Sequence, residues 1–141
     1  MVRIISFWEQ GWNTPIKEYD LWHFPCREFK VDELVMMPVS GIFAPDIKEY
    51  QTFDEIERDD SVYVFVDEEG DECLEDFIHP ENATYVFGRS GLSSIDVFKQ
   101  ESDKSVKIKS PLGQGMFWGH QIMSILLYDR MKKLGECNIE E

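Results

Sequence analysis

The most informative stretch of this 141-residue chain reads His79-Pro80-Glu81-Asn82-Ala83-Thr84-Tyr85-Val86-Phe87-Gly88. Residues 84–87 are an apolar run that predicts a short strand, and the glycine after them permits a tight backbone bend. A second run, Val62-Tyr63-Val64-Phe65-Val66, is nearly continuous and ends in the acidic turn 67–70. Such runs are typical of strands that are covered on both faces. Both runs therefore predict strands of a sheet.

Working outward from these two strands, we find further short apolar runs that alternate with segments of helical spacing. Proline and glycine residues mark their ends, because proline disfavours a helical residue before it. Thr52 and Glu55 have the spacing of a capping box, which predicts the start of a short helix. We expect strands at 3–8, 33–38, 62–66, 84–87 and 106–108, and helices at 15–24 (stopped before Pro25), from 52, at 73–79 and at 117–133.

Strands that alternate with helices predict the α/β class, with a mainly parallel sheet covered by helices on both faces. The length fits a single domain over residues 1–135, followed by the acidic tail 136–141. Ligands of such sheets collect beyond the carboxyl ends of the strands. In this chain those ends carry residues 67–70, 88–92 and 110–115.

Composition excludes several classes of protein. No apolar run approaches the roughly 20 residues of a membrane helix, so we expect a soluble, cytoplasmic protein without a membrane partner. The three cysteines, Cys26, Cys73 and Cys137, lie far apart and have no histidine at zinc spacing. We therefore expect reduced thiols and no metal site.

The net charge of −14 by itself argues against nucleic-acid binding, but the charges are distributed unevenly along the chain. Residues 1–88 hold 21 acidic and 6 basic side chains, a balance of −15, whereas residues 89–133 hold 4 acidic and 8 basic ones, a balance of +4. The C-terminal half could thus face an anionic partner while the rest keeps the protein soluble. A solvated basic face is the alternative.

The amino-acid sequence of the two strands and of the loops after them resembles that of the SpoU/TrmH branch of the SPOUT methyltransferases. The segment 79–88 is similar to an H-P-x-N-A segment that leads through a strand to F-G, and 106–115 with 122–128 resembles the family's last strand, cofactor loop and helix. The resemblance covers about residues 60–133. It implies a deep C-terminal trefoil knot, a homodimer, S-adenosylmethionine as cofactor and methyl transfer to RNA (tRNA or rRNA), often to a ribose 2′-hydroxyl.

The resemblance also implies where the cofactor binds. Loops after the strands would supply an apolar slot for adenine and backbone polar groups, provided that glycines allow a close approach. The candidate cofactor-binding residues are Val66, Asp67, Phe87, Gly88, Gly91, Ile108, Gly113, Gly115 and Met116.

The chain departs from the family pattern at its catalytic positions. Aligning Asn13 with the family's N-x-G-x-x-x-R puts Tyr19 where the arginine should be, and the S-x-N motif reads Met116-Phe117-Trp118. We therefore consider three replacements. Arg89 could hold a phosphate, His120 has a suitable intrinsic pKa for a general base, and Tyr19 occupies the arginine position.

Three alternatives stay open. The same departures fit a different acceptor, such as a base nitrogen or a substrate other than RNA. They also fit a degenerate protein of this fold that binds cofactor or RNA, or dimerises, without turnover. An unrelated flavodoxin-like nucleotide binder would carry a similar order of elements.

Overall fold

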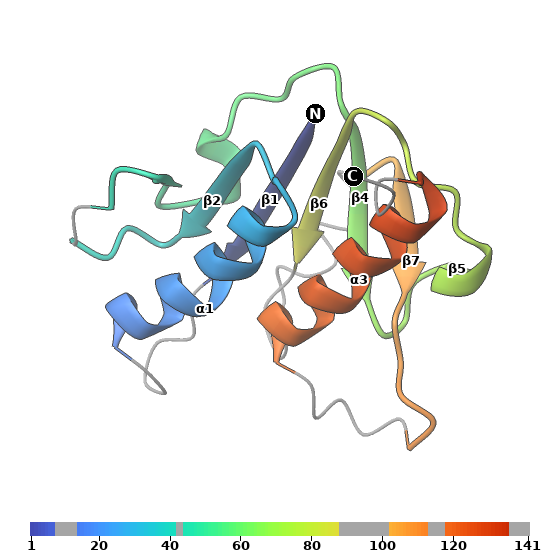
Figure 1. Cartoon of the computed structure of the whole chain (residues 1–141). Coiled ribbons are helices and arrows are strands. Elements are labelled where there is room, and N and C mark those ends of the chain that lie inside the picture. The colour runs from blue at the N-terminus through green and yellow to red at the C-terminus, as the bar shows by residue number, and fades with distance from the viewer. Residues whose placement is uncertain (8–13, 42–43, 88–101, 113–117, 136–141) are drawn as a thin grey trace.

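The computed structural model of the protein describes residues 1–7, 14–41, 44–87, 102–112 and 118–135 (Figure 1). These residues form parallel strands, two α-helices and two 3-10 turns. In chain order they are β1 (Val2–Phe7), α1 (Pro15–Glu28), β2 (Glu33–Met37), β3 (Ile47–Glu49), η1 (Phe53–Glu55), β4 (Val62–Asp67), β5 (Glu72–Cys73), η2 (Leu74–Asp76), β6 (Ala83–Phe87), β7 (Lys104–Lys107) and α3 (Gly119–Lys133).

The strands form one seven-stranded sheet in the order β3-β2-β1-β6-β4-β7-β5. Every neighbouring pair is parallel; Ile4 of β1, for example, lies between Leu34 of β2 and Tyr85 of β6. All carboxyl ends of the strands therefore meet at one edge of the sheet. The predicted mainly parallel α/β fold is confirmed.

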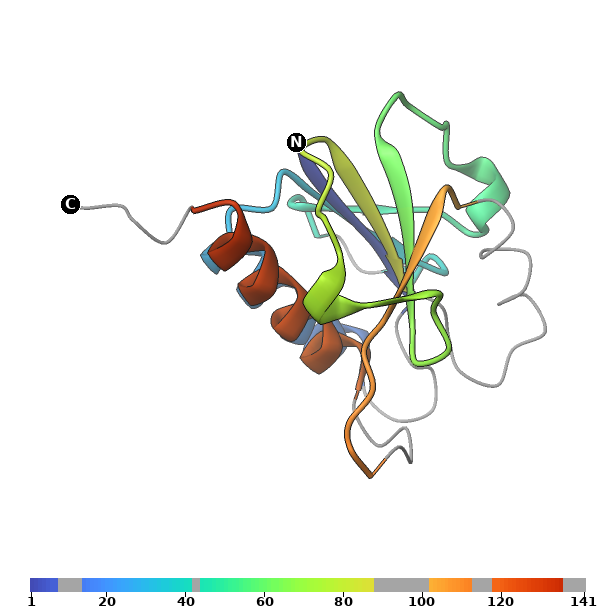
Figure 2. The ribbon, with the colours of Figure 1, turned by 90° about the vertical axis from the view of Figure 1, so that its right-hand side faces the viewer.

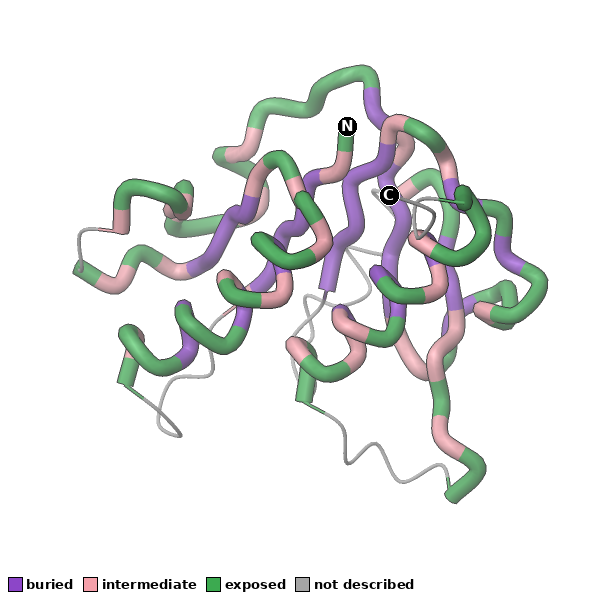
Figure 3. Tube along the Cα trace, viewed as in Figure 1, coloured by how far each residue is buried: buried purple, intermediate pink, exposed green. Residues whose placement is uncertain are grey.

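Both α-helices lie side by side on one face of the sheet, and η1 lies on the other face (Figures 1 and 2). The alternation of side chains along β1 shows the two layers of the core. Ile4 packs with Trp22 of α1 and Leu126 of α3, whereas Ile5 packs on the opposite face with Phe53 of η1. Figure 3 shows that the helices are buried on the side towards the strands.

The helix predicted over residues 15–24 is longer than expected, because α1 continues through Pro25 to Glu28. Its start follows the expected rules: Pro15 occupies the first turn, and the Thr14 hydroxyl accepts from the Lys17 amide at 3.4 Å. Proline inside a helix removes one backbone hydrogen bond. The helix continues past this point, and its residue Cys26 is buried against the core.

Two other segments that were predicted to be short α-helices have a different secondary structure. The segment 73–79 contains the end of β5 and the 3-10 turn η2. The helix expected from Thr52 is the single turn η1, and the Thr52 side chain makes no capping bond. Glu55 instead accepts from the Gln51 amide at 3.0 Å. Strand β3 was not predicted, because its three residues contain one apolar side chain.

A buried polar network fixes α3 to the segment before β6. His79 Nδ1 lies 2.7 Å from the Tyr85 hydroxyl, and Nε2 lies 2.8 Å from the Asp129 carboxylate. Arg130 donates to the same hydroxyl at 3.0 Å and to two backbone carbonyls of residues 80–81. These bonds are mutually consistent if Tyr85 donates to Nδ1 and Nε2–H donates to Asp129.

Acidification should weaken the fold through this network. Desolvation lowers the pKa of His79 from its usual 6.5, although the ion pair with Asp129 opposes the shift. The unfolded chain therefore takes up this proton first as the pH falls. Stability from this group is complete above about pH 6.5 and declines below it, by up to about 1.4 kcal/mol per pH unit. Urea unfolding at pH 7.5, 6.5 and 5.5 should show a steeper decline for the wild type than for His79→Gln. Equal slopes would contradict this assignment.

The predicted knot depends on the paths of residues 88–101 and 113–117, which lie outside the described residues, and it stays a prediction. Within the described ranges, none of the helices has the length and apolar character to cross a membrane. The same ranges contain no group of three His, Cys, Asp or Glu side chains that could hold a metal ion.

Candidate functional site

Three apolar side chains of the predicted site meet at the carboxyl edge of the sheet. Val66 near the end of β4 is paired in register with Phe87 at the end of β6, and both are buried. Ile108 follows β7, and its amide donates to the Asp67 carbonyl at 3.3 Å. All three pack in the core layer beneath the helices. Their role in cofactor binding stays a prediction.

Asp67 opens the turn that closes this edge. Its carboxylate accepts from the Glu69 amide at 3.2 Å, and its carbonyl accepts from the Gly70 amide at 3.3 Å. A Cβ at Gly70 would lie 2.4 Å from the backbone carbon and oxygen of Val106. Only glycine therefore lets this turn approach β7 so closely. The turn holds the Asp67 carboxylate at the rim of the edge.

An aromatic cluster connects the two helices to the same edge. The Trp22 ring of α1 meets Phe87 edge-on with ring centroids 5.5 Å apart, and it meets His120 edge-on at 6.2 Å. The Trp118 ring stacks on the His120 ring, with ring centroids 6.3 Å apart and an interplanar angle of 20°. Gly119 makes this packing possible, since a Cβ there would lie 2.8 Å from the Trp22 ring. His120 thus contacts two indole rings, one of which, Trp22, also contacts Phe87 at the end of β6.

The surroundings of His120 favour a neutral imidazole. Desolvation lowers the pKa of His120 below its usual 6.5, against the opposing effect of the Glu18 carboxylate. A neutral imidazole at pH 7 has one free nitrogen lone pair and can accept a proton. His120 therefore has the charge state that a general base needs, at the edge where the sequence predicts a ligand.

Tyr19 lies elsewhere. Its hydroxyl donates to Glu49 of β3, which also accepts from the Ser40 hydroxyl at 2.7 Å. In the sheet order β3 is three strands away from β6, or about 14 Å at the usual strand spacing. Burial and the bond to Glu49 raise the pKa of Tyr19 far above neutrality. This geometry supports a structural role for Tyr19 and does not support the predicted catalytic one.

The remaining predicted site residues lie outside the described residues. These are the catalytic candidate Arg89 and the cofactor-binding candidates Gly88, Gly91, Gly113, Gly115 and Met116. Sequence reasoning missed Glu18 and Trp22 as parts of the site. Their only sequence signal is the spacing of four residues, which places both on one face of α1.

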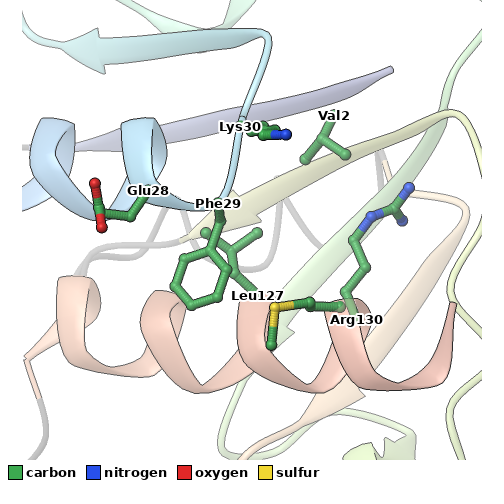
Figure 4. A pocket seen from close by; sticks show the side chains of 7 residues that line it. Val2, Glu28, Phe29, Lys30, Leu127 and Arg130 are labelled. Atoms are coloured by element: carbon green, nitrogen blue, oxygen red, sulfur yellow. The ribbon is translucent and has the colours of Figure 1, made fainter. Parts of the chain in front are cut away.

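A cavity of about 330 Å³ opens at the opposite, amino-terminal edge of the sheet, between the ends of α1 and α3 (Figure 4). Val2, Phe29 and Leu127 line it together with the side chain of Arg130. Figure 4 shows the guanidinium directed away from Phe29 and Leu127, and its hydrogen bonds go to the segment before β6. Glu28, Lys30 and Met131 complete the lining, which contains none of the predicted site residues.

Comparison with solved structures identifies proteins of the same fold. The structure of the SpoU methyltransferase AviRb from Streptomyces viridochromogenes, in complex with AdoMet, matches with a TM-score of 0.69 and 13% identity, over 95% of this chain and 57% of that one. A Bacillus anthracis protein assigned as an RNA methyltransferase matches with a TM-score of 0.70 and 13% identity, over 100% and 99%. A structure that addresses the 2-OH methylation of C or U at position 34 of tRNA matches at 0.69 and 12%, over 96% and 91%.

At these identities the comparisons show the fold, and this chain spans 57% of the length of AviRb. No protein-family model matches the sequence, and the curated proteins contain no match to it. What the chain does must therefore be argued from its own residues at the carboxyl edge.

Proposed function

We propose that this chain, whose fold is that of the SpoU methyltransferases, is an S-adenosylmethionine-dependent RNA methyltransferase of the cytoplasm. We propose tRNA or rRNA as its substrate and a ribose 2′-hydroxyl as its acceptor. One of the structural neighbours concerns 2-OH methylation of tRNA, and another was solved with AdoMet bound. These likenesses support the proposal but do not carry it.

The observation that carries the proposal is that Val66, Phe87 and Ile108 meet at the carboxyl edge of the parallel sheet, and that the Trp22 ring, which contacts Phe87, also contacts His120. The edge fits the cofactor in one respect, because its apolar side chains suit the adenine ring. We propose that the backbone at Gly88, Gly91, Gly113, Gly115 and Met116 completes this slot.

We propose a separate role in the reaction for each of three residues of the chain. When bound, S-adenosylmethionine supplies a methyl group on a positively charged sulfur. We propose that His120, which is joined to this edge through the Trp22 ring, takes the proton of the acceptor hydroxyl as a neutral imidazole. Asp67 places a negative charge at the rim, where it can attract the cationic end of the cofactor. We propose Arg89 as the residue that holds an RNA phosphate by two hydrogen bonds.

Calorimetric titration with S-adenosylmethionine and S-adenosylhomocysteine tests the proposal first. We expect one binding site per subunit with micromolar affinity. Transfer of a labelled methyl group to total tRNA or rRNA then separates an active enzyme from a degenerate protein of the same fold, which would bind without transfer. Binding of a flavin, with no binding of either sulfur ligand, would overturn the proposal.

We also propose a homodimer formed through the outer sides of α1 and α3. These sides expose four large apolar side chains: Leu21 (39%), Phe24 (56%), Ile125 (39%) and Tyr128 (53%). Because the two helices lie side by side on one face, one surface can pair with its own copy across a two-fold axis. Aromatic side chains at the centre of such an interface contribute most of the binding energy.

Phe24→Asp should dissociate this dimer. A buried carboxylate in an apolar interface costs several kcal/mol, so the dissociation constant should rise at least about 30-fold. Sedimentation equilibrium over a range of protein concentrations measures it. Val39→Asp is the matched control, since Val39 is also exposed (49%) but follows β2 and belongs to neither helix. A wild-type monomer, or equal dimerisation of the two variants, would contradict the interface.

A further inference from the structure

The cavity at the amino-terminal edge of the sheet has the size of a small-molecule site (Figure 4). Its volume of about 330 Å³ lies at the lower end of the range for ligand pockets, roughly 300–1,000 Å³. Its apolar lining comes from β1, from the end of α1 and from α3, and consists of Val2, Phe29, Leu127 and Met131. The cavity can therefore hold the apolar body of a small molecule.

Lys30, which also lines the cavity, has a backbone conformation that lysine seldom adopts. Its φ is 56°, in the left-handed region, just after the end of α1, where glycine is the usual residue. The Lys30 amide donates to the Arg27 carbonyl at 3.1 Å, and the Val31 amide donates to the Cys26 carbonyl at 2.8 Å. These bonds need the backbone shape but not the lysine side chain. A strained lysine at this position indicates that its side chain has a use of its own.

The amine of Lys30 lies where it can meet a ligand. Lys30 is exposed, and Figure 4 shows its amine directed towards Val2. Two acids are close in the sequence. The Glu28 side chain points away from the amine in Figure 4, and the Asp32 carboxylate accepts from the Val2 amide at 2.7 Å. The positive charge of the amine is therefore the one presented to a molecule that enters beside Val2.

Arg130 adds a second cationic group on the other side of Val2 (Figure 4). The residue is 5% exposed, and its terminal nitrogens donate to the segment before β6. Its Nε, in contrast, is buried and has no hydrogen-bond partner among the residues that the structure describes. A buried N–H without an acceptor costs free energy, and most such groups in proteins have a partner. An anionic group bound against Val2 would offer this N–H an acceptor.

We propose that this cavity is a binding site for a small organic anion with an apolar body, such as an aromatic carboxylate or sulfonate. The apolar body packs against Phe29 and Leu127, and the anionic group lies between the Lys30 amine and Arg130. Burial of the apolar surface and a charge-assisted contact together provide the affinity. This inference does not depend on the proposed methyl transfer.

Two fluorescent probes with the same aromatic body test the inference on the full-length protein. The anionic probe is 8-anilinonaphthalene-1-sulfonate, and the neutral one is N-phenyl-1-naphthylamine. Fluorescence titration with direct excitation of each probe should show saturable binding of the sulfonate, at about one per chain. Lys30→Met should raise its dissociation constant about tenfold, because one charge-assisted contact is lost, and should change that of the neutral probe less than about twofold.

Three further variants serve as controls. Lys132→Met removes an exposed lysine of α3 that does not line the cavity, so both affinities should stay unchanged. Lys30→Gly should weaken sulfonate binding as Lys30→Met does, yet unfold at the same or a higher urea concentration than the wild type, because glycine adopts a positive φ freely. Met131→Trp fills the cavity and should weaken binding of both probes. If circular dichroism shows that Met131→Trp does not fold, the two Lys30 variants decide.

Equal affinity of the wild type and Lys30→Met for the sulfonate would overturn the inference, as would a wild type without saturable binding. Saturating S-adenosylhomocysteine should leave the affinity for the sulfonate unchanged. Competition between the two would place the probe at the carboxyl edge and would also overturn the inference. Failure of the proposed function looks different, because the wild type would then bind the sulfonate but not S-adenosylhomocysteine.

Discussion

Replacement of Arg130 by methionine should lower the free energy of unfolding by about 3 kcal/mol or more. The guanidinium is buried and donates to the carbonyls of Pro80 and Glu81, at 2.6 and 2.9 Å, and to the Tyr85 hydroxyl at 3.0 Å. Methionine fills most of the volume but leaves these acceptors without donors. Urea unfolding at pH 7.5, monitored by tryptophan fluorescence, measures the loss.

Lys132→Met is the matched control for Arg130→Met. Lys132 belongs to the same turn of α3 but is exposed, so its replacement should change the free energy of unfolding by less than about 0.5 kcal/mol. Equal unfolding midpoints for the two variants would show that the network between α3 and β6 contributes little to stability.

Trp22→Ala should cost about 3–5 kcal/mol and also weaken cofactor binding. The indole is 3% exposed and fills the space between Phe87, Gly119 and His120. Its removal leaves a cavity that these neighbours cannot close without moving the start of α3. The proposed binding edge lies at that point, so the affinity for S-adenosylhomocysteine should fall together with stability.

Ile16→Ala tests whether the effect is specific to the buried face of α1. Ile16 lies in the first turn of the same helix but is 59% exposed. Both variants lose apolar side-chain atoms, yet only Trp22→Ala opens a cavity. If Trp22→Ala unfolded at the same urea concentration as Ile16→Ala, the aromatic cluster would not be a structural centre of the protein.

The central strands could be predicted from sequence because their signal is local. Residues 62–66 and 84–87 are continuous apolar runs, and burial on both faces of a parallel sheet produces that pattern directly. Strands without such a local run, such as β3, were not predicted for the same reason. β3 has one apolar residue, and its register is set by hydrogen bonds to β2 that no local pattern encodes.

The candidate site was predicted in part. Val66 and Phe87 were identified because the ends of parallel strands must meet at one edge. The burial of Glu18 was missed, since buried acids are rare. Tyr19 was predicted by alignment with a motif position, yet its side chain faces Glu49 and β3. Position along a motif does not determine which side of a helix a residue occupies.

The strand order has a consequence for how the protein is made. β1 and β6 are neighbours in the centre of the sheet, yet Arg3 pairs with Thr84, which lies 81 positions later. In a nascent chain that ends before β6, one edge of β1 has no hydrogen-bonded neighbour. The apolar residues Ile4 and Ile5 belong to this unpaired strand. Sheets with such long-range pairs form slowly, and their unpaired edges are prone to aggregate. Ribosome stalling or truncation upstream of residue 83 should therefore yield insoluble chains that need a chaperone.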